Sequence, residues 1–376
     1  RVFVELLRQD KFSHNELQQS INKIKSSFAD AVPLIGLTHR DLHEESKNLL
    51  LPQKIEKKAD ESKGSALPFC HLHVHTQFSV LQSTISIKKL VQEAVAMNMN
   101  AVAITDIGNL MGAFHFVKEV NKYNNSIENR DGNPLKPIIG ITLNVCVNHL
   151  DRSHRDDGYQ MVMIAKNKKG YHNIAKLSSI AHTQGFYYVP RIDRDLIDKH
   201  KEDIIVLTGN LYGEVPNKAL NVGFQQAEDS LLWWKEKFGS DLYVEIMRHN
   251  QEDEKRVNSF LIEMAKKHSI KLIASNNCFY LKKEEANAHD ILLCVKDGEK
   301  QSTPIGRGRG YRYGLPNQEY YFKSSLEMTQ LFSDIPEAIE NIQDIVKKVE
   351  HFELARDVLL PKFDIPKRFL VDEDVK

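Results

Sequence analysis

Short apolar runs and amphipathic stretches alternate along the chain from residue 68 onward. The apolar runs predict buried β-strands at residues 69–74, 101–105, 138–147, 161–165, 204–208, 243–247 and 272–275. Amphipathic stretches between them, such as 223–238 and 253–268, predict helices. Repeated β-α units indicate a parallel sheet, closed into a barrel or left open. His75 and Asp106 follow two different strands, which favours the closed barrel, because strand ends meet at one rim of a barrel.

The ends of the chain differ from this alternation. Ser13 and Glu16 have the spacing of a capping box ahead of residues with helical periodicity, whereas the stretch before residue 68 is rich in charge and poor in large apolar residues. The predicted organisation is a helical segment (1–52), a charged linker (53–67), a compact α/β domain (68–350) and a connecting tail (351–376).

Composition and charge exclude some classes of protein. Hydrophobic residues make up 41% and charged residues 27%, as in globular proteins. Lys+Arg and Asp+Glu number 51 each, so bulk charge does not argue for nucleic-acid binding, although a local basic patch is compatible with it. The four cysteines are scattered and no apolar run is long enough to span a membrane, so we expect a cytoplasmic chain with no membrane association. The chain begins at Arg1, which favours a piece of a longer protein.

Three histidines stand at every second position of the first strand of the compact domain. His71, His73 and His75 would share one face, because strand side chains alternate with period two. Imidazole is the commonest protein ligand for zinc-like metals, so these residues and Asp106 are candidate metal ligands. The alternatives are a hydrogen-bonded polar cluster inside the barrel for the histidines, and a turn or helix cap for Asp106.

The sequence around these residues resembles a known family. His71-Leu72-His73-Val74-His75 and the run ending at Asp106 are similar to the first two motifs of the polymerase and histidinol phosphatase (PHP) domain. Further stretches resemble the PHP domains of the alpha subunits of bacterial DNA polymerase III, at residues 109–113, 136–140, 165–171, 185–188 and 288–293. The resemblance covers about residues 68–350 and implies a distorted (β/α)7 TIM-like barrel.

Active members of this family hold a metal cluster at the barrel rim and hydrolyse phosphoesters. The resemblance gives His73, His75 and Asp106 as retained ligand positions, and His71 at a position that often carries a carboxylate. Other ligand positions are occupied by Gln82, Ile107, Thr142, Gln160, Asn210, Asn277 and Phe279. Amides are weak donors and the apolar residues offer none, whereas catalytic zinc usually needs three protein ligands. We therefore expect a degenerate site with no catalytic residue, no other cofactor and at most one weakly bound zinc or manganese ion.

Residues 306–313 are the one place where basic and aromatic residues interleave. Arg307, Arg309 and Arg312 could contact phosphates while Tyr311 stacks on a base. The alternative is a flexible, solvated loop.

Two functions remain open at this point. The first is a structural and docking module that supports the polymerase core and a proofreading exonuclease. The second is a residual metal-dependent phosphoesterase or 3′–5′ exonuclease at the histidines. The resemblance implies that DNA synthesis, with Mg²⁺, belongs to a palm domain absent from this chain, and residues 359–366 resemble the connection to it. Residues 2–8 resemble the last helix of a proofreading exonuclease domain. The expected partners are the remainder of the alpha subunit, the exonuclease and, through the full-length protein, DNA.

Overall fold

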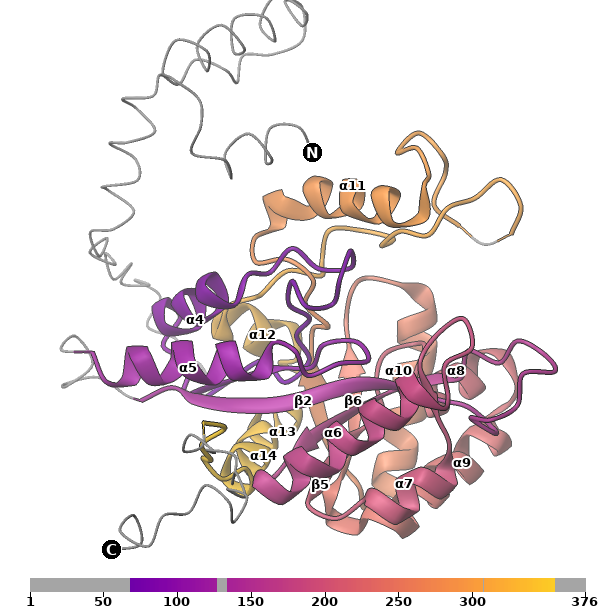
Figure 1. Cartoon of the computed structure of the whole chain (residues 1–376), viewed down its shortest axis with the longest axis horizontal. Helices are drawn as coiled ribbons and strands as arrows, with labels where there is room; N and C mark the ends of the chain where they lie inside the picture. The colour runs from indigo at the N-terminus through magenta and orange to yellow at the C-terminus, as the bar shows by residue number, and fades with distance from the viewer. Residues whose placement is uncertain (1–67, 127–133, 307, 356–376) are drawn as a thin grey trace, which may run out of the picture. The chain divides into compact units, whose positions relative to one another are not determined.

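The computed structural model describes residues 68–126, 134–306 and 308–355 (Figure 1). The predicted segments 1–52 and 53–67, and most of the tail from residue 351, lie outside these residues. The described strands are β1 (Ala101–Ile104), β2 (Lys136–Val145), β3 (Tyr159–Ala165), β4 (Arg191–Ile192), β5 (Ile204–Leu207), β6 (Leu242–Met247) and β7 (Lys271–Ser275). Each strand predicted from residue 101 onward therefore has a counterpart.

Helices lie between most of the strands. The described α-helices are α4 (Ile87–Ala96), α5 (Ala113–Asn124), α6 (Lys168–Thr183), α7 (Arg194–His200), α8 (Glu214–Asn221), α9 (Phe224–Phe238), α10 (Glu252–Lys267), α11 (Ala286–Asp297), α12 (Ser325–Leu331), α13 (Glu337–Glu340) and α14 (Ile342–Lys348). Two short 3₁₀ turns occupy Gly239–Asp241 and Lys283–Glu285. Within the described ranges, none of the helices is both long and apolar enough to cross a membrane.

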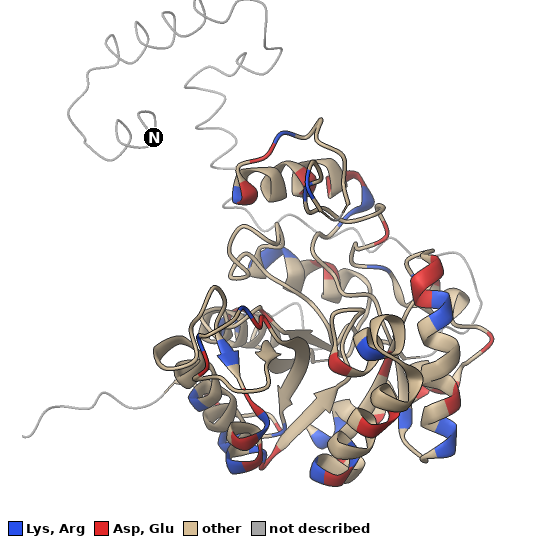
Figure 2. Ribbon diagram, turned by 90° about the vertical axis from the view of Figure 1, so that its right-hand side faces the viewer, with Lys and Arg blue, Asp and Glu red and all other residues tan. Residues whose placement is uncertain are grey.

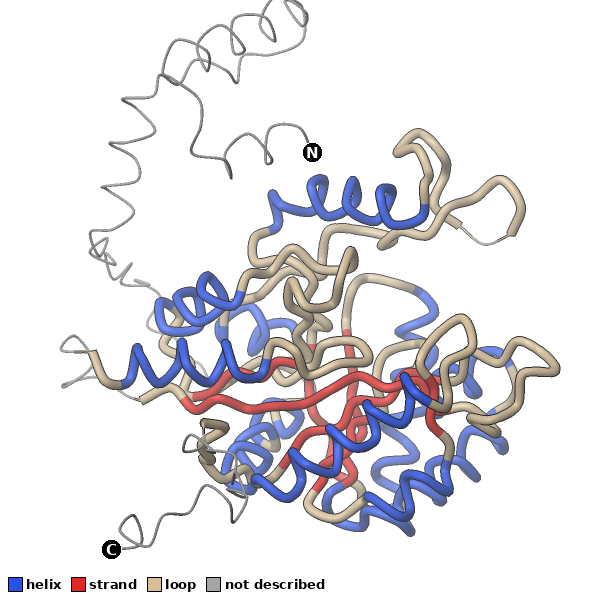
Figure 3. The backbone as a smooth tube through the Cα atoms, viewed as in Figure 1, coloured by secondary structure: helices blue, strands red, loops and turns tan. Residues whose placement is uncertain are grey.

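The strands form one curled sheet in the order β1-β2-β3-β5-β6-β7, with β4 paired to β2 (Figure 3). The pairs β1–β2, β5–β6 and β6–β7 are parallel, but β3 runs antiparallel to both β2 and β5. The prediction of a parallel sheet is therefore wrong at β3. Residues 146–158, which join β2 to β3, contain no helix, so the chain turns back on itself instead of crossing over to run parallel.

The segment 71–75 connects the two ends of this sheet. On one side Thr105 N donates a hydrogen bond to Val74 O (2.7 Å), and on the other His75 N donates to Cys278 O (2.9 Å), beyond the end of β7. The predicted α/β barrel is thus confirmed in a distorted form. The closing segment is not the regular strand predicted at 69–74, because only Val74 forms a bridge, with Cys278.

Apolar side chains fill the space inside the barrel and under the helices. Every residue of β1, β5 and β6 is buried. On the outside, α4 buries one face, which comprises Ile87, Leu90, Val91 and Ala94. Acidic and basic residues are interspersed over the helices, while the strands are mostly neutral (Figure 2). The buried polar side chains of the domain include the three histidines of the closing segment and Glu245 on β6.

Candidate functional site

His73 and His75 lie side by side inside the barrel. Their ring centroids are 5.1 Å apart and each residue is only 1% exposed. His73 Nδ1 donates to Glu245 Oε1 (2.9 Å), and His75 Nε2 contacts Asn277 Oδ1 (2.9 Å). Three buried polar atoms of this group make no hydrogen bond among the described residues: His73 Nε2, His75 Nδ1 and Glu245 Oε2.

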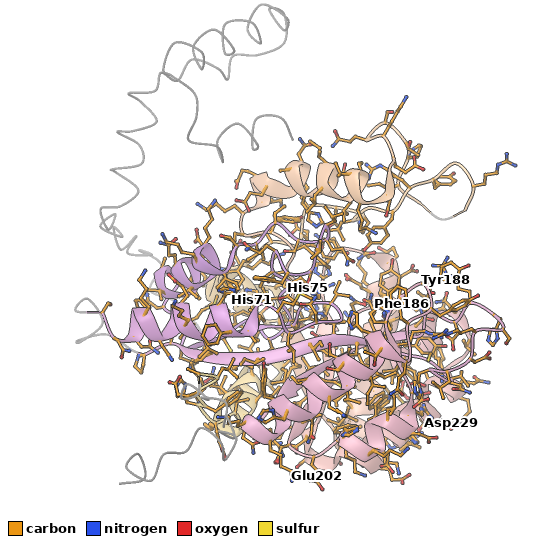
Figure 4. All side chains as sticks on the ribbon, viewed as in Figure 1. His71, His75, Phe186, Tyr188, Glu202 and Asp229 are labelled. Atoms are coloured by element: carbon orange, nitrogen blue, oxygen red, sulfur yellow. The ribbon has the colours of Figure 1, made fainter. Side chains whose placement is uncertain are left out.

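His71 has different neighbours from the other two histidines. Its Nε2 lies 2.8 Å from Lys323 O, and its ring packs between Phe69 and Phe322. Figure 4 marks His71 and His75, which belong to the same closing segment. The predicted shared face of three histidines is therefore reduced to a pair, because the backbone bends at residues 72–73 and loses the period-two alternation of a strand.

Burial keeps two of the rings neutral. It lowers the pKa of His71 to about 4. The pKa of His75 is also well below its ordinary value, because of burial first and repulsion from His73 second. A neutral imidazole has one donor and one acceptor nitrogen, so His71 Nε2 donates to the Lys323 carbonyl.

Asp106 is engaged with the turn that follows the closing segment. Its carboxylate accepts hydrogen bonds from Thr76 N (2.6 Å), Thr76 Oγ1 (2.7 Å) and Ser79 Oγ (2.7 Å). Burial raises the pKa of Asp106, and the hydrogen bonds from Ser79 and Thr76 oppose that effect. These contacts correspond to the turn-capping alternative rather than to a carboxylate held open for a metal.

Several replaced ligand positions make specific contacts inside the barrel. Phe279 stacks on the His75 ring, with centroids 4.5 Å apart at 23°. Asn277 is hydrogen-bonded to His75, and Thr142 Oγ1 donates to Thr105 O (3.0 Å). Asn210 Oδ1 accepts from Tyr212 N (2.8 Å) in the loop after β5. These four positions, at which the resemblance places metal ligands, are thus used for packing and for hydrogen bonds within the chain.

The donors that remain do not make up the ligand set of a metal cluster. Asp106 and His71 are engaged elsewhere, and no three His, Cys, Asp or Glu side chains in the described part of the chain are arranged to hold an ion. The His73–Glu245 contact does resemble the carboxylate–histidine pairing that orients metal-binding imidazoles. That the site holds at most one weakly bound ion accordingly stays a prediction.

Glu245 is the residue that sequence reasoning missed. It lies in the middle of β6, where all six residues are buried, and it is 1% exposed itself. A carboxylate within an otherwise apolar buried run is expensive unless it has a partner. That pattern, Leu242-Tyr243-Val244-Glu245-Ile246-Met247, was a usable signal in the sequence.

The predicted nucleic-acid-binding loop is only partly available to a ligand. Arg309 and Tyr311 are exposed, and Arg307 lies outside the described residues. Arg312 is 5% exposed, and its guanidinium makes a two-bond ion pair with Asp290 on α11 (2.6 and 2.9 Å). Arg312 anchors the loop to α11 through this paired and buried charge, and nucleic-acid binding by the loop stays a prediction.

Comparisons with known proteins identify the domain. Residues 71–249 match the PHP domain family. The chain is 36% identical over 306 residues to DNA polymerase III subunit alpha of Borreliella burgdorferi, covering 80% of this chain and 25% of that protein. With DNA polymerase III subunit alpha of Campylobacter jejuni it is 34% identical over 320 residues, covering 82% and 25%. A crystal structure described as a candidate metal-dependent phosphoesterase from Bifidobacterium adolescentis overlaps 69% of this chain and 95% of its own, with a TM-score of 0.39 and 12% identity.

Residues 71–249 belong to the PHP domain family, which confirms the class indicated by the closing segment and by Asp106. The chain that contains this domain is homologous to DNA polymerase III subunit alpha from several bacteria. It spans about a quarter of the length of the curated relatives it matches.

Proposed function

We propose that the chain supplies the PHP-domain region of a replicative DNA polymerase III alpha subunit, and that this domain is a structural and docking module without phosphoesterase activity. The observation that carries the proposal is the state of the barrel site. Phe279 and Asn277 hold the His75 ring at positions where the resemblance places an Asp-x-His pair of metal ligands. A side chain that stacks on a histidine leaves no room for a metal ligand at the same position.

The proposed partners follow from the length of the relatives. Because the chain matches about a quarter of each DNA polymerase III alpha subunit, the partners we propose are the remaining part of the subunit and, through it, DNA. A proofreading exonuclease is a further proposed partner. DNA synthesis, with its Mg²⁺, is assigned to the palm of the parent protein.

A residual metal-dependent phosphoesterase is the second candidate. It is favoured by His73 Nε2, His75 Nδ1 and Glu245 Oε2, which lie on neighbouring side chains and have no hydrogen-bond partner among the described residues. These side chains are not arranged as a three-ligand metal site within the described residues, and hydrolysis by this family relies on a cluster that both activates water and stabilises the leaving oxygen.

The experiment compares hydrolysis by the 376-residue chain and its variants. The chain is incubated with zinc or manganese and a single-stranded oligonucleotide or an activated phosphodiester. We expect no metal-dependent product, and His73→Ala should differ from the unsubstituted chain in thermal stability alone. Metal-dependent hydrolysis that is abolished by His73→Ala but kept by His71→Gln would contradict the structural assignment, because His71 lies outside the pair.

Docking is tested separately, by measuring association of the 376-residue chain with a purified proofreading exonuclease from a related replisome in sedimentation experiments. A concentration-dependent complex supports the exonuclease as a partner. If the sedimentation coefficient of the chain does not change as the exonuclease is added, the exonuclease is not a partner.

A further inference from the structure

A pocket of about 530 Å³ opens at the edge of the barrel where β1, β2 and β5 end. Its lining includes Gln82 from the segment before α4, Ile107 after β1, Asn144 at the end of β2, Gln160 at the start of β3 and Tyr212 after β5. Binding sites of α/β barrels lie at this edge, and ligand pockets of small molecules have this size. The pocket is therefore in the position and size range of a binding site.

The pocket is distinct from the buried histidine pair. His73 and His75 are not among its lining residues and are 1% exposed. Three of the replaced ligand positions, Gln82, Ile107 and Gln160, do line it. Two of these replacements, Gln82 and Gln160, therefore contribute amide side chains to the wall of the pocket.

The side chains that line the pocket offer almost no free charge with which to bind an ion. No Lys or Arg occurs among the described residues that line the pocket. The one carboxylate, that of Asp157, already accepts two hydrogen bonds from Arg155 through one oxygen and a third through the other. A phosphate would find no cation in this lining, and a metal ion would find a single, already paired carboxylate. The ligand that fits this lining is neutral.

The groups free to bind are neutral donors and acceptors beside aromatic rings. No hydrogen bond within the described residues engages the side-chain amides of Gln82 or Gln160. His182 donates through Nδ1 to Ser178 O (2.9 Å), which leaves Nε2 as an acceptor at the wall. Gln160 and Tyr212 are adjacent, because Gln160 N donates to Tyr212 O (2.9 Å), and Tyr212 is 44% exposed.

We propose that this pocket binds a neutral nucleobase, with Gln82 and Gln160 hydrogen-bonded to its edge and Tyr212 against its face. A glutamine amide presents a donor and an acceptor side by side, which complements the adjacent acceptor and donor on the edge of a base. Tyrosine rings stack on bases irrespective of their identity. The base can come from a free nucleoside or from an unpaired position of a single strand, and the two sources share this chemistry.

The test uses calorimetric titration of the 376-residue chain with uncharged nucleosides, with 2-deoxyribose, and with a short single-stranded oligonucleotide. We expect saturable binding of a nucleoside or of the oligonucleotide and none of 2-deoxyribose. Gln160→Ala should weaken that binding by about fivefold, the effect of one lost hydrogen bond. Gln330→Ala, which removes an exposed glutamine on α12, is the matched control and should leave binding unchanged.

The outcomes distinguish a free nucleoside from a single strand as the source of the base, and they also show whether the proposal fails. Binding of nucleosides alone assigns the pocket to a free ligand, and tighter binding of the oligonucleotide that still depends on Gln160 assigns it to a strand. Equal binding of 2-deoxyribose, binding that Gln160→Ala leaves intact in a folded protein, or no binding of either probe would overturn the proposal. None of these outcomes depends on phosphoesterase activity, so the proposed function is tested independently.

Discussion

His73 and Glu245 form a contact that is sealed from solvent, with side chains 1% and 0% exposed. Burying a carboxylate is costly unless hydrogen bonds compensate it. In the part of the chain that the structure describes, one oxygen of Glu245 is hydrogen-bonded and the other has no partner. His71 is buried as well, and its Nε2 donates a hydrogen bond to the backbone carbonyl of Lys323. Single side chains in this region therefore affect stability strongly.

We predict that Glu245→Ala lowers the free energy of unfolding by about 1–3 kcal/mol, because it leaves the buried Nδ1–H of His73 without an acceptor. Chemical denaturation monitored by circular dichroism measures the change. Glu236→Ala is the control, since the Glu236 side chain is 71% exposed. Equal effects of the two substitutions would show that the buried contact has no special role.

The stability of the chain should also depend on pH through His71. Its pKa in the folded protein, about 4, lies below the ordinary value of 6.5, so the unfolded chain takes up a proton that the folded chain excludes. The contribution is complete above pH 6.5 and is lost as the pH falls towards 4, by on the order of 3 kcal/mol for this residue. His75, whose pKa is also lowered, acts in the same direction.

The measurement is the free energy of unfolding across this pH range for His71→Gln. Glutamine stays neutral and its amide can still donate to Lys323 O, so we expect a shallower slope than in the unsubstituted chain. His172→Gln on the exposed face of α6 should leave the slope unchanged. A slope that His71→Gln does not alter would rule out His71 as the titrating group.

At the scale of elements, two features should be sensitive to substitution. They are the close approach of β2 to its neighbouring strands and the anchoring of the loop that follows α11. Gly140 lies in β2 between β1 and β3, where a Cβ would come within 2.8 Å of Met163 O and 3.0 Å of Thr105 Cγ2. The loop after α11 is held by Arg312 and Asp290. Both features depend on contacts between segments that are distant in sequence.

Gly140→Ala should destabilise the barrel by about 1–3 kcal/mol, because the strand backbone must shift to admit the methyl group. Thermal unfolding measures the loss. Gly298→Asn is the matched control: Gly298 has φ +69°, which asparagine tolerates, and nothing lies within 4 Å of an added Cβ. If both variants unfold at the same temperature as the unsubstituted chain, the strands around Gly140 admit a methyl group without strain and the prediction is wrong.

Arg312→Ala should release the loop after α11 from its anchor. We expect faster chymotryptic cleavage at Tyr311 and Tyr313, because the ion pair with Asp290 is lost. Arg309→Ala removes an exposed arginine of the same loop and should leave the cleavage rate unchanged. Identical rates in the two variants would mean that the Arg312 contact does not hold the loop.

For the whole molecule, the sequence predicts the strands and the barrel well, because apolar runs bounded by polar residues have a direct physical meaning. It does not predict the antiparallel direction of β3, since pairing direction depends on the path of residues 146–158 and not on periodicity. The separation of His71 from His73 was also hidden, because it depends on a local bend. The pairing of Glu245 with His73 and that of Arg312 with Asp290 join segments that are distant in sequence, so periodicity does not predict them. The buried carboxylate of Glu245 nevertheless left a signal in the sequence.

We propose that the barrel site is structural and does not require a metal. The most direct test of this proposal is the thermal unfolding of the metal-free 376-residue chain with and without added zinc or manganese, because an ion that binds the folded state raises the unfolding temperature. We predict an unfolding temperature that these metals leave unchanged and that His73→Ala lowers equally in their presence and absence. A rise in unfolding temperature with zinc or manganese that disappears in His73→Ala would contradict the account.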